Sequence, residues 1–230
     1  MKKTKSFLVL VFGIAAISSY YTFFDSFGTR AADTATVSGT VTSGITLGVT
    51  PTTVSFPSSF DGFVGGAAKT IDGITMNVKT NGNYNLKLKK NHYLCKESVA
   101  DTCTGTTTTQ FEDIITSGSP IYDWSVGNNE RKFGFSLKSV DSGITPADRY
   151  LNDGSGACNY SGGTLVSDKC WDYFPTSDVV IASGTPTTAS GSNTVIKINA
   201  QIGTVDESAS DYLEAGAYTT IITATATLNP

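Results

Sequence analysis

The sequence predicts an all-β protein, built as an antiparallel sandwich of two sheets. Apolar and polar residues alternate with a period of two in several separate segments, which is the pattern of half-buried strands. Glycine, proline and asparagine separate these segments, as expected for turns between strands. No long segment carries a helical repeat, and strands do not alternate with helices. These observations together favour a sandwich over a parallel sheet.

The first predicted strand covers residues 35–49, and Pro51 ends its alternation. Its apolar residues occupy odd positions and are Val37, Val41, Ile45, Leu47 and Val49. A strand with this pattern has two interpretations. It folds onto its own domain, or it is a donor strand that completes the sheet of a neighbouring subunit.

A strong turn signal at residues 80–83 separates two further alternating segments. Residues 74–78 alternate before the turn and residues 84–88 after it, so the sequence predicts a β-hairpin. Lys87 and Lys89 are expected to point to solvent. Additional strands are predicted at residues 133–137 and 196–202, which also alternate.

The last predicted strand covers residues 217–228 and places Tyr218, Ile222 and Leu228 on one face. Threonine and isoleucine, which favour strands, are frequent in this segment. The sequence therefore predicts a strand that is central in its sheet and hydrogen-bonded on both sides.

Residues 1–31 have the pattern of an export signal. Three lysines precede an apolar run of about 11 residues that begins at Phe7. We expect cleavage after Ala31, with Ser18 as the second choice. A retained anchor is the alternative, because the run extended to Phe24 reaches the shortest length of a membrane span. An uncleaved signal is then the only expected contact with a membrane, and residues 32–230 form a single extracellular domain at the cell surface.

The charge balance disfavours several classes of partner. Removal of residues 1–31, which hold four basic residues and one acidic residue, changes the net charge from −4 to −7. An acidic chain without a basic cluster binds nucleic acid poorly, so no nucleic-acid partner is expected. Charged residues are only 16% of the chain, so hydroxyl and amide groups must cover most of the surface.

Residues 91–126 and 141–178 are predicted to be long loops of the same domain. They contain all the cysteines of the chain, which are Cys95, Cys103, Cys158 and Cys170. An even number of cysteines in an exported chain favours disulfides. We expect Cys95 to pair with Cys103 and Cys158 with Cys170, because these pairs are local. Zinc is disfavoured because the cysteine spacing is unusual for zinc and His92 is the only histidine.

No enzyme activity, cofactor or metal is expected. The sequence has neither a Gly-x-Ser-x-Gly elbow nor a phosphate-binding loop. Residues 141–148 and 152–155 offer oxygen ligands but match no complete calcium loop. We interpret the carboxylates at residues 112–113, at Asp172 and Asp178, and at residues 206–214 as solvated loop charges. A glycosidase pair is the alternative for such carboxylates.

Aromatic residues in the long loops are candidates for ligand contacts. Trp124, Trp171 and Tyr173 either pack against the ends of the sandwich or lie exposed, where they would stack on sugar rings. Residues 159–161 also fit the acceptor pattern for N-glycosylation.

Three segments, residues 41–56, 77–88 and 214–224, resemble secreted bacterial surface proteins of the spore-coat U and archaic chaperone–usher pilin type. Those proteins end in a similar Ala-Gly-x-Tyr-x-x-x-Ile strand, which here begins at Ala215. Their first strand region usually contains a cysteine, which this chain lacks there. The resemblance implies an Ig-like or pilin-like sandwich that is incomplete and accepts a strand from a neighbour.

The sequence therefore favours a secreted structural subunit of an extracellular filament or surface assembly built by β-strand addition. Its expected partners are copies of itself or other surface subunits. The alternative is an adhesin or carbohydrate-binding surface module that binds a glycan through the aromatic loops.

Overall fold

The computed structural model describes residues 43–62, 65–103, 108–205 and 212–229 of the chain. Contacts within the chain divide it after Val41. The predicted export signal, as well as Val37 and Val41, lies outside the described residues, so these predictions remain predictions.

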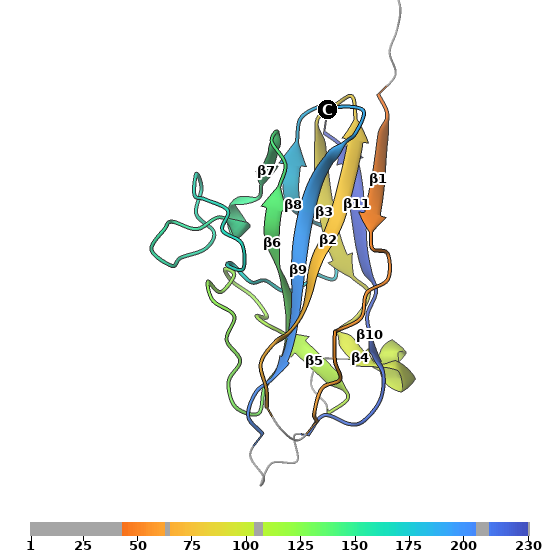
Figure 1. The fold of residues 1–230 in the computed structure, drawn as a ribbon, viewed down its shortest axis with the longest axis vertical. Coiled ribbons are helices and arrows are strands. Elements are labelled where there is room, and N and C mark those ends of the chain that lie inside the picture. The colour runs from red at the N-terminus through yellow and green to blue at the C-terminus, as the bar shows by residue number, and fades with distance from the viewer. Residues whose placement is uncertain (1–42, 63–64, 104–107, 206–211, 230) are drawn as a thin grey trace, which may run out of the picture. The chain divides into compact units, whose positions relative to one another are not determined.

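The described strands form two sheets (Figure 1). The larger sheet contains, in spatial order, β1 (Ile45–Thr50), β2 (Lys69–Thr80), β9 (Ser192–Ile202), β6 (Arg131–Val140), β5 (Gln110–Asp113), β4 (Leu94–Lys96) and β10 (Tyr218–Thr219). The smaller sheet contains β11 (Ile222–Leu228), β3 (Tyr84–Lys90), β8 (Val179–Gly184) and β7 (Ile144–Pro146). The paired strands are antiparallel except β5 and β6, which run parallel. The all-β class is confirmed.

The core lies between the two sheets and is filled by every second residue of their strands. The larger sheet contributes Met76 and Val78 of β2 and Leu137 of β6, while the smaller sheet contributes Leu86 and Leu88 of β3. All five are at most 1% exposed. Alternating side chains point to opposite faces of a strand, so this burial follows directly from the period of two in the sequence.

The predicted hairpin around residues 80–83 is wrong. β2 and β3 flank this turn, but they belong to different sheets, so the turn carries the chain from one sheet to the other (Figure 1). β2 pairs with β1 and β9, and β3 pairs with β11 and β8. The alternation correctly indicated which face of each strand is buried, but it contains no information about which strand lies beside it.

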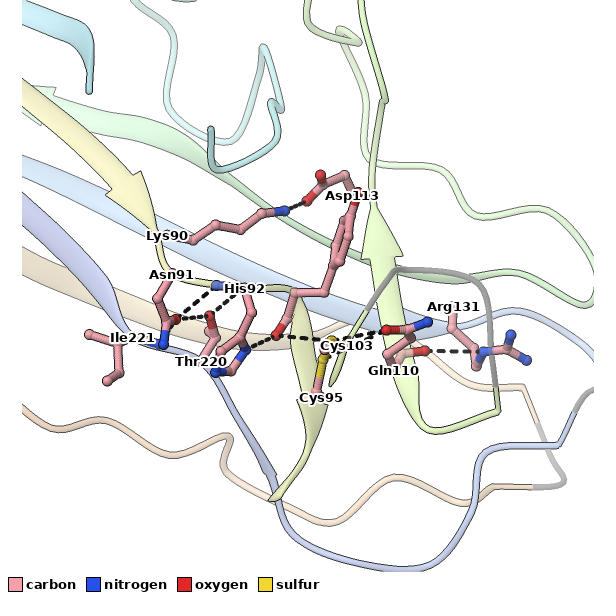
Figure 2. Close-up of a disulfide and its surroundings, with 11 residues drawn as sticks. Lys90, Asn91, His92, Cys95, Cys103, Gln110, Asp113, Arg131, Thr220 and Ile221 are labelled. Carbon is pink, nitrogen blue, oxygen red and sulfur yellow. Dashed lines mark hydrogen bonds and ion pairs between the residues drawn. A yellow bond between two sulfur atoms is a disulfide. The ribbon is translucent and has the colours of Figure 1, made fainter. Parts of the chain in front are cut away.

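The last predicted strand is also different from the prediction. It divides into β10, at the edge of the larger sheet, and β11, at the edge of the smaller sheet. The amide of Ile221 donates to Asn91 Oδ1 (2.8 Å), and Thr220 Oγ1 donates to the carbonyl of His92 (2.7 Å; Figure 2). These bonds hold the chain where it crosses between the sheets. The predicted central position is therefore wrong.

The two predicted loop segments also contain short regular elements. Residues 91–126 hold β4, β5 and the 3-10 helix η2 (Glu97–Thr102). Residues 141–178 hold β7 and the 3-10 helix η3 (Asp148–Tyr150). β4 and β5 extend the larger sheet, which positions one buried carboxylate described below.

Candidate functional site

β1 and β11 are the last strands of their respective sheets and lie side by side on one side of the sandwich (Figure 1). Within the described part of the chain, β1 pairs only with β2 and β11 only with β3. Each strand therefore has one row of backbone N–H and C=O groups without a neighbouring strand, which is the feature that lets a sheet accept another strand. We call this pair of strands the open edge.

The apolar side chains of the open edge are incompletely covered. Ile45, Leu47 and Val49 of β1 and Ile222 and Ala224 of β11 pack against the core but are only half-buried. The residues opposite them on β2 and β3 are at most 7% exposed. An additional strand along this side would bury the apolar area that β1 and β11 leave accessible.

The predicted assembly strand is placed only in part. Ile45, Leu47 and Val49 belong to β1, where Leu47 lies opposite Val78 and Val49 opposite Met76 of the same chain. For these three residues the structure therefore follows the first interpretation, in which the segment folds onto its own domain. The residues before β1, including Val37 and Val41, are the ones for which the donor interpretation stays open.

Both disulfides have the predicted pairing. Cys95 is bonded to Cys103, with their Cα atoms 6.2 Å apart, and Cys158 is bonded to Cys170, with their Cα atoms 5.6 Å apart. Each bond closes a short segment within one of the two predicted loop regions. The disulfides fit a protein of an oxidising compartment.

His92 is the one histidine of the chain and lies close to the first disulfide (Figure 2). Its ring and the sulfur atoms of Cys95 and Cys103 are near enough to share a metal ion. Metal ligation by cysteine requires thiolates, and these two sulfur atoms are bonded to each other. The His92 ring nitrogen Nδ1 instead lies 2.6 Å from the carbonyl oxygen of Tyr93.

The predicted ligand aromatics do not form one exposed surface. Trp171 is buried, its ring contacts that of Trp124 edge-on, and its indole N–H donates to the carbonyl of Asp168. Trp124 is half-buried and donates to Gln201. Tyr173 is half-buried beneath the guanidinium of Arg149. Trp171 is therefore a packed interior side chain. Only Trp124 and Tyr173 keep some exposed surface on which a sugar ring could stack.

A buried ion pair connects the two sheets, and the sequence reasoning missed it. Lys90 Nζ contacts Asp113 Oδ1, and the side chains are only 1% and 7% exposed (Figure 2). Lys90 is the last residue of β3 in the smaller sheet, whereas Asp113 is the last residue of β5 in the larger sheet. The prediction that Asp113 is a solvated loop charge is therefore wrong.

The periodicity of the strands explains why these charged residues point inward. Leu86 and Leu88 of β3 face the core, and Lys90 continues the same face two residues later. Phe111 of β5 is fully buried, and Asp113 follows it at the same spacing. The signal was present in the sequence, but it is visible only if the alternation is continued through a charged residue.

Burial shifts both groups of this pair toward their neutral forms. Desolvation raises the pKa of Asp113 to about 6, although the charge of Lys90 opposes the shift. Desolvation also lowers the pKa of Lys90, again against the attraction of Asp113. The ring of Tyr93 covers the amine, with its centroid 3.9 Å from Nζ, which helps to exclude water.

A second buried carboxylate, Asp172, is held by Arg149 through two hydrogen bonds. Asp172 is 2% exposed and also accepts the amide hydrogen of Tyr173 (2.9 Å). The hydrogen bonds that Arg149 donates to Asp172 raise the pKa of the Arg149 guanidinium above its usual value. Asp172 is therefore a structural ion-pair partner, and its prediction as a solvated loop charge is wrong.

A cavity of about 330 Å³ lies at the edge formed by β10. Its wall is largely aromatic and aliphatic and includes Phe56, Phe60, Leu94, Leu213 and Tyr218. Phe60 and Tyr218 both contact the ring of Phe111, so the cavity wall continues into the core. The size and lining suit a small apolar group, but few polar side chains converge there to orient it.

Comparison of the chain with family models, curated proteins and solved structures found no match. Among the described residues, none of the helices has the length and apolar character needed to cross a membrane.

Proposed function

We propose that the protein is a secreted subunit of an extracellular filament or surface assembly, in which neighbouring subunits are joined by β-strand addition. The observation that carries this proposal is the open edge: two adjacent outer strands that each pair with one strand only among the described residues, and whose apolar side chains are half-exposed. An edge of this kind favours pairing with another strand. The disulfides fit the extracellular location.

The donor strand in this proposal is the segment that directly precedes β1. Residues 35–41 carry the alternation that β1 continues, with Val37 and Val41 as their apolar positions. Because residues 45–50 are already paired with β2, the donor cannot extend through β1 without disrupting the subunit's own sheet. The proposal therefore limits the donor to residues 35–42, and the acceptor is the open edge of the next subunit. This arrangement is the incomplete pilin-like sandwich that the resemblance implies.

The apolar burial and backbone pairing in such an addition can stabilise the assembly enough to exceed the cost of association. Burial of one valine side chain stabilises a complex by about 1.5–3 kcal/mol, and the covered side chains of the acceptor contribute further. Association costs of about 4–15 kcal/mol must be subtracted. Two donor valines, the half-buried residues of the open edge and a new row of backbone hydrogen bonds together are of the size needed to exceed that cost.

The test is a matched pair of charged substitutions in the donor segment. Val41→Asp places a charge on the apolar face, whereas Thr40→Asp places the same charge on the opposite face. We expect Val41→Asp to abolish assembly, seen as a change from large species to monomer in sedimentation velocity. Its circular dichroism spectrum and melting temperature should match those of wild-type monomer obtained by dilution, because the core of the subunit is unchanged.

Thr40→Asp should still assemble, and negative-stain images should show the same particles as for the wild type. A folded wild-type protein that stays monomeric at every concentration would contradict the proposal. A melting temperature of Val41→Asp below that of the wild-type monomer would show instead that residue 41 belongs to the core of its own domain.

A further inference from the structure

We propose that the side chains of Lys90 and Asp113 form a covalent amide bond, made by the folded protein itself and joining its two sheets. The contact between Lys90 Nζ and the Asp113 carboxylate carries this inference (Figure 2). Among the ion pairs between described residues, this pair is the only one in which both side chains are buried. Burial of an ion pair is costly, which sets this pair apart from the exposed ones.

The surroundings supply a nucleophile and an electrophile in reactive forms. An amine attacks a carbonyl group only when it is neutral, and burial lowers the pKa of Lys90 in that direction. A carboxylic acid is attacked more readily than a carboxylate, and burial raises the pKa of Asp113 to about 6. One proton transfer within the contact therefore converts the ion pair into a neutral amine beside a neutral acid.

The reaction is a condensation that needs no oxidant or co-reactant. Lys90 Nζ attacks Cγ of the protonated Asp113 carboxyl, and a new N–C bond forms. The C–O bond to the hydroxyl group then breaks, and this group leaves as water after it takes a proton from the nitrogen. The product is a neutral amide, and the displaced water is the only by-product. The fold holds the two groups in contact, which replaces the entropy cost of bringing them together.

Neighbouring groups act on the two reactants. The negative charge of Asp172 favours the protonated form of Asp113, while the positive charge of Lys132 opposes it. The Tyr93 ring covers the lysine nitrogen and limits the entry of water, which would otherwise favour the charged forms. These groups come from the segment after β3, from β6 and from the segment before β8, so residues on several sides of the pair determine its protonation.

The amide would join the two sheets covalently, which neither disulfide does. Each disulfide closes a short loop, whereas an amide between Lys90 and Asp113 would connect the end of β3 to the end of β5 in the opposite sheet. The two sheets would then stay joined even under reducing conditions. Such a bond suits a subunit that has to resist extension or unfolding after export.

Peptide mapping of the exported wild-type protein tests the proposal directly. After complete reduction and alkylation, trypsin should leave residues 90–96 joined to residues 97–131, with a mass one water below the sum of the two peptides. Reduction is essential, because the Cys95–Cys103 disulfide joins the same two peptides. Trypsin should also fail to cleave after Lys90, because an acylated lysine is not recognised.

Two lysine variants serve as matched controls. Lys90→Arg keeps the positive charge but removes the amine, so its two peptides should separate. Lys89→Arg changes the neighbouring lysine, which pairs with Asp178 at the surface, and should keep the linked peptide. If the wild-type protein is folded by circular dichroism but yields separate peptides after reduction, the proposal is overturned and the pair is only an ion pair. Linked peptides in Lys90→Arg would assign the bond to another lysine and would also overturn it.

Discussion

At the scale of single residues, the carboxylate of Asp172 shows how a charge is stabilised inside this sandwich. It accepts two hydrogen bonds from Arg149 and one from the amide of Tyr173. The side chain of Arg149 reaches solvent with 26% of its surface, so this pair is only partly desolvated. Removal of Asp172 would leave a guanidinium without its anion above the ring of Tyr173.

We therefore expect Asp172→Ala to lower the free energy of unfolding by about 3 kcal/mol, near the lower end for a buried ion pair. The control is Asp72→Ala, which breaks the exposed pair with Lys138 and should cost at most about 1 kcal/mol. Urea unfolding followed by fluorescence measures both. Equal losses for the two variants would show that the Asp172 pair contributes no more than a surface pair.

At the scale of strands, the register separates β1 from the segment that precedes it. Both carry the same alternation, but Leu47 packs against the core opposite Val78, whereas Val41 lies outside the described residues. The two positions therefore have different expected roles despite the same pattern in the sequence.

We expect Leu47→Asp to destabilise the subunit, because the charge enters an apolar contact with β2. Because Leu47 is only half-buried, the loss should be about 2 kcal/mol, the lower end of the range for removal of a buried leucine side chain, and it should appear in the monomer. Thermal unfolding measures it, with Thr46→Asp on the exposed face of β1 as the control. A stable Leu47→Asp subunit that fails only in assembly would contradict the assignment of β1 to its own domain.

The strands also show how far the sequence predicts this fold. The alternation correctly indicated the buried faces at residues 74–78, 84–88, 133–137 and 196–202. It could not distinguish a hairpin from a crossing between sheets, because a strand buries the same face in either case. The division of the last strand at Thr220 could not be predicted for another reason. It depends on hydrogen bonds to residues 91 and 92, which are distant in the sequence.

The charged residues of the core were the least predictable part of the candidate site. Composition rules place lysine and aspartate at the surface, since an unpaired buried charge is unstable. Lys90 and Asp113 are exceptions because each one has the other as partner, and their pairing depends on contacts between two sheets. The cysteine pairs were predicted correctly because both are local and need no knowledge of the fold.

At the scale of the whole molecule, two features define the proposed role of the subunit. The open edge provides a place where a strand from a neighbour can be added, and the disulfides, together with the proposed amide, hold the sandwich together. The open edge consists of β1 and β11, whereas Lys90 and Asp113 belong to β3 and β5, so assembly and internal linkage can be lost separately. Val41→Asp should therefore keep the amide, and Lys90→Arg should keep assembly.

Hydrogen exchange of β11 tests the central claim, that the open edge accepts a strand, most directly. The amides of residues 222–228 should exchange faster in the Val41→Asp monomer than in assembled wild-type protein, because assembly adds a hydrogen-bonded strand beside β11. The amides of β9, which already lies between β2 and β6, provide the internal reference and should exchange equally in both samples. The account predicts protection on assembly that is concentrated in β1 and β11. Assembled protein in which residues 222–228 exchange as fast as in the monomer would contradict it.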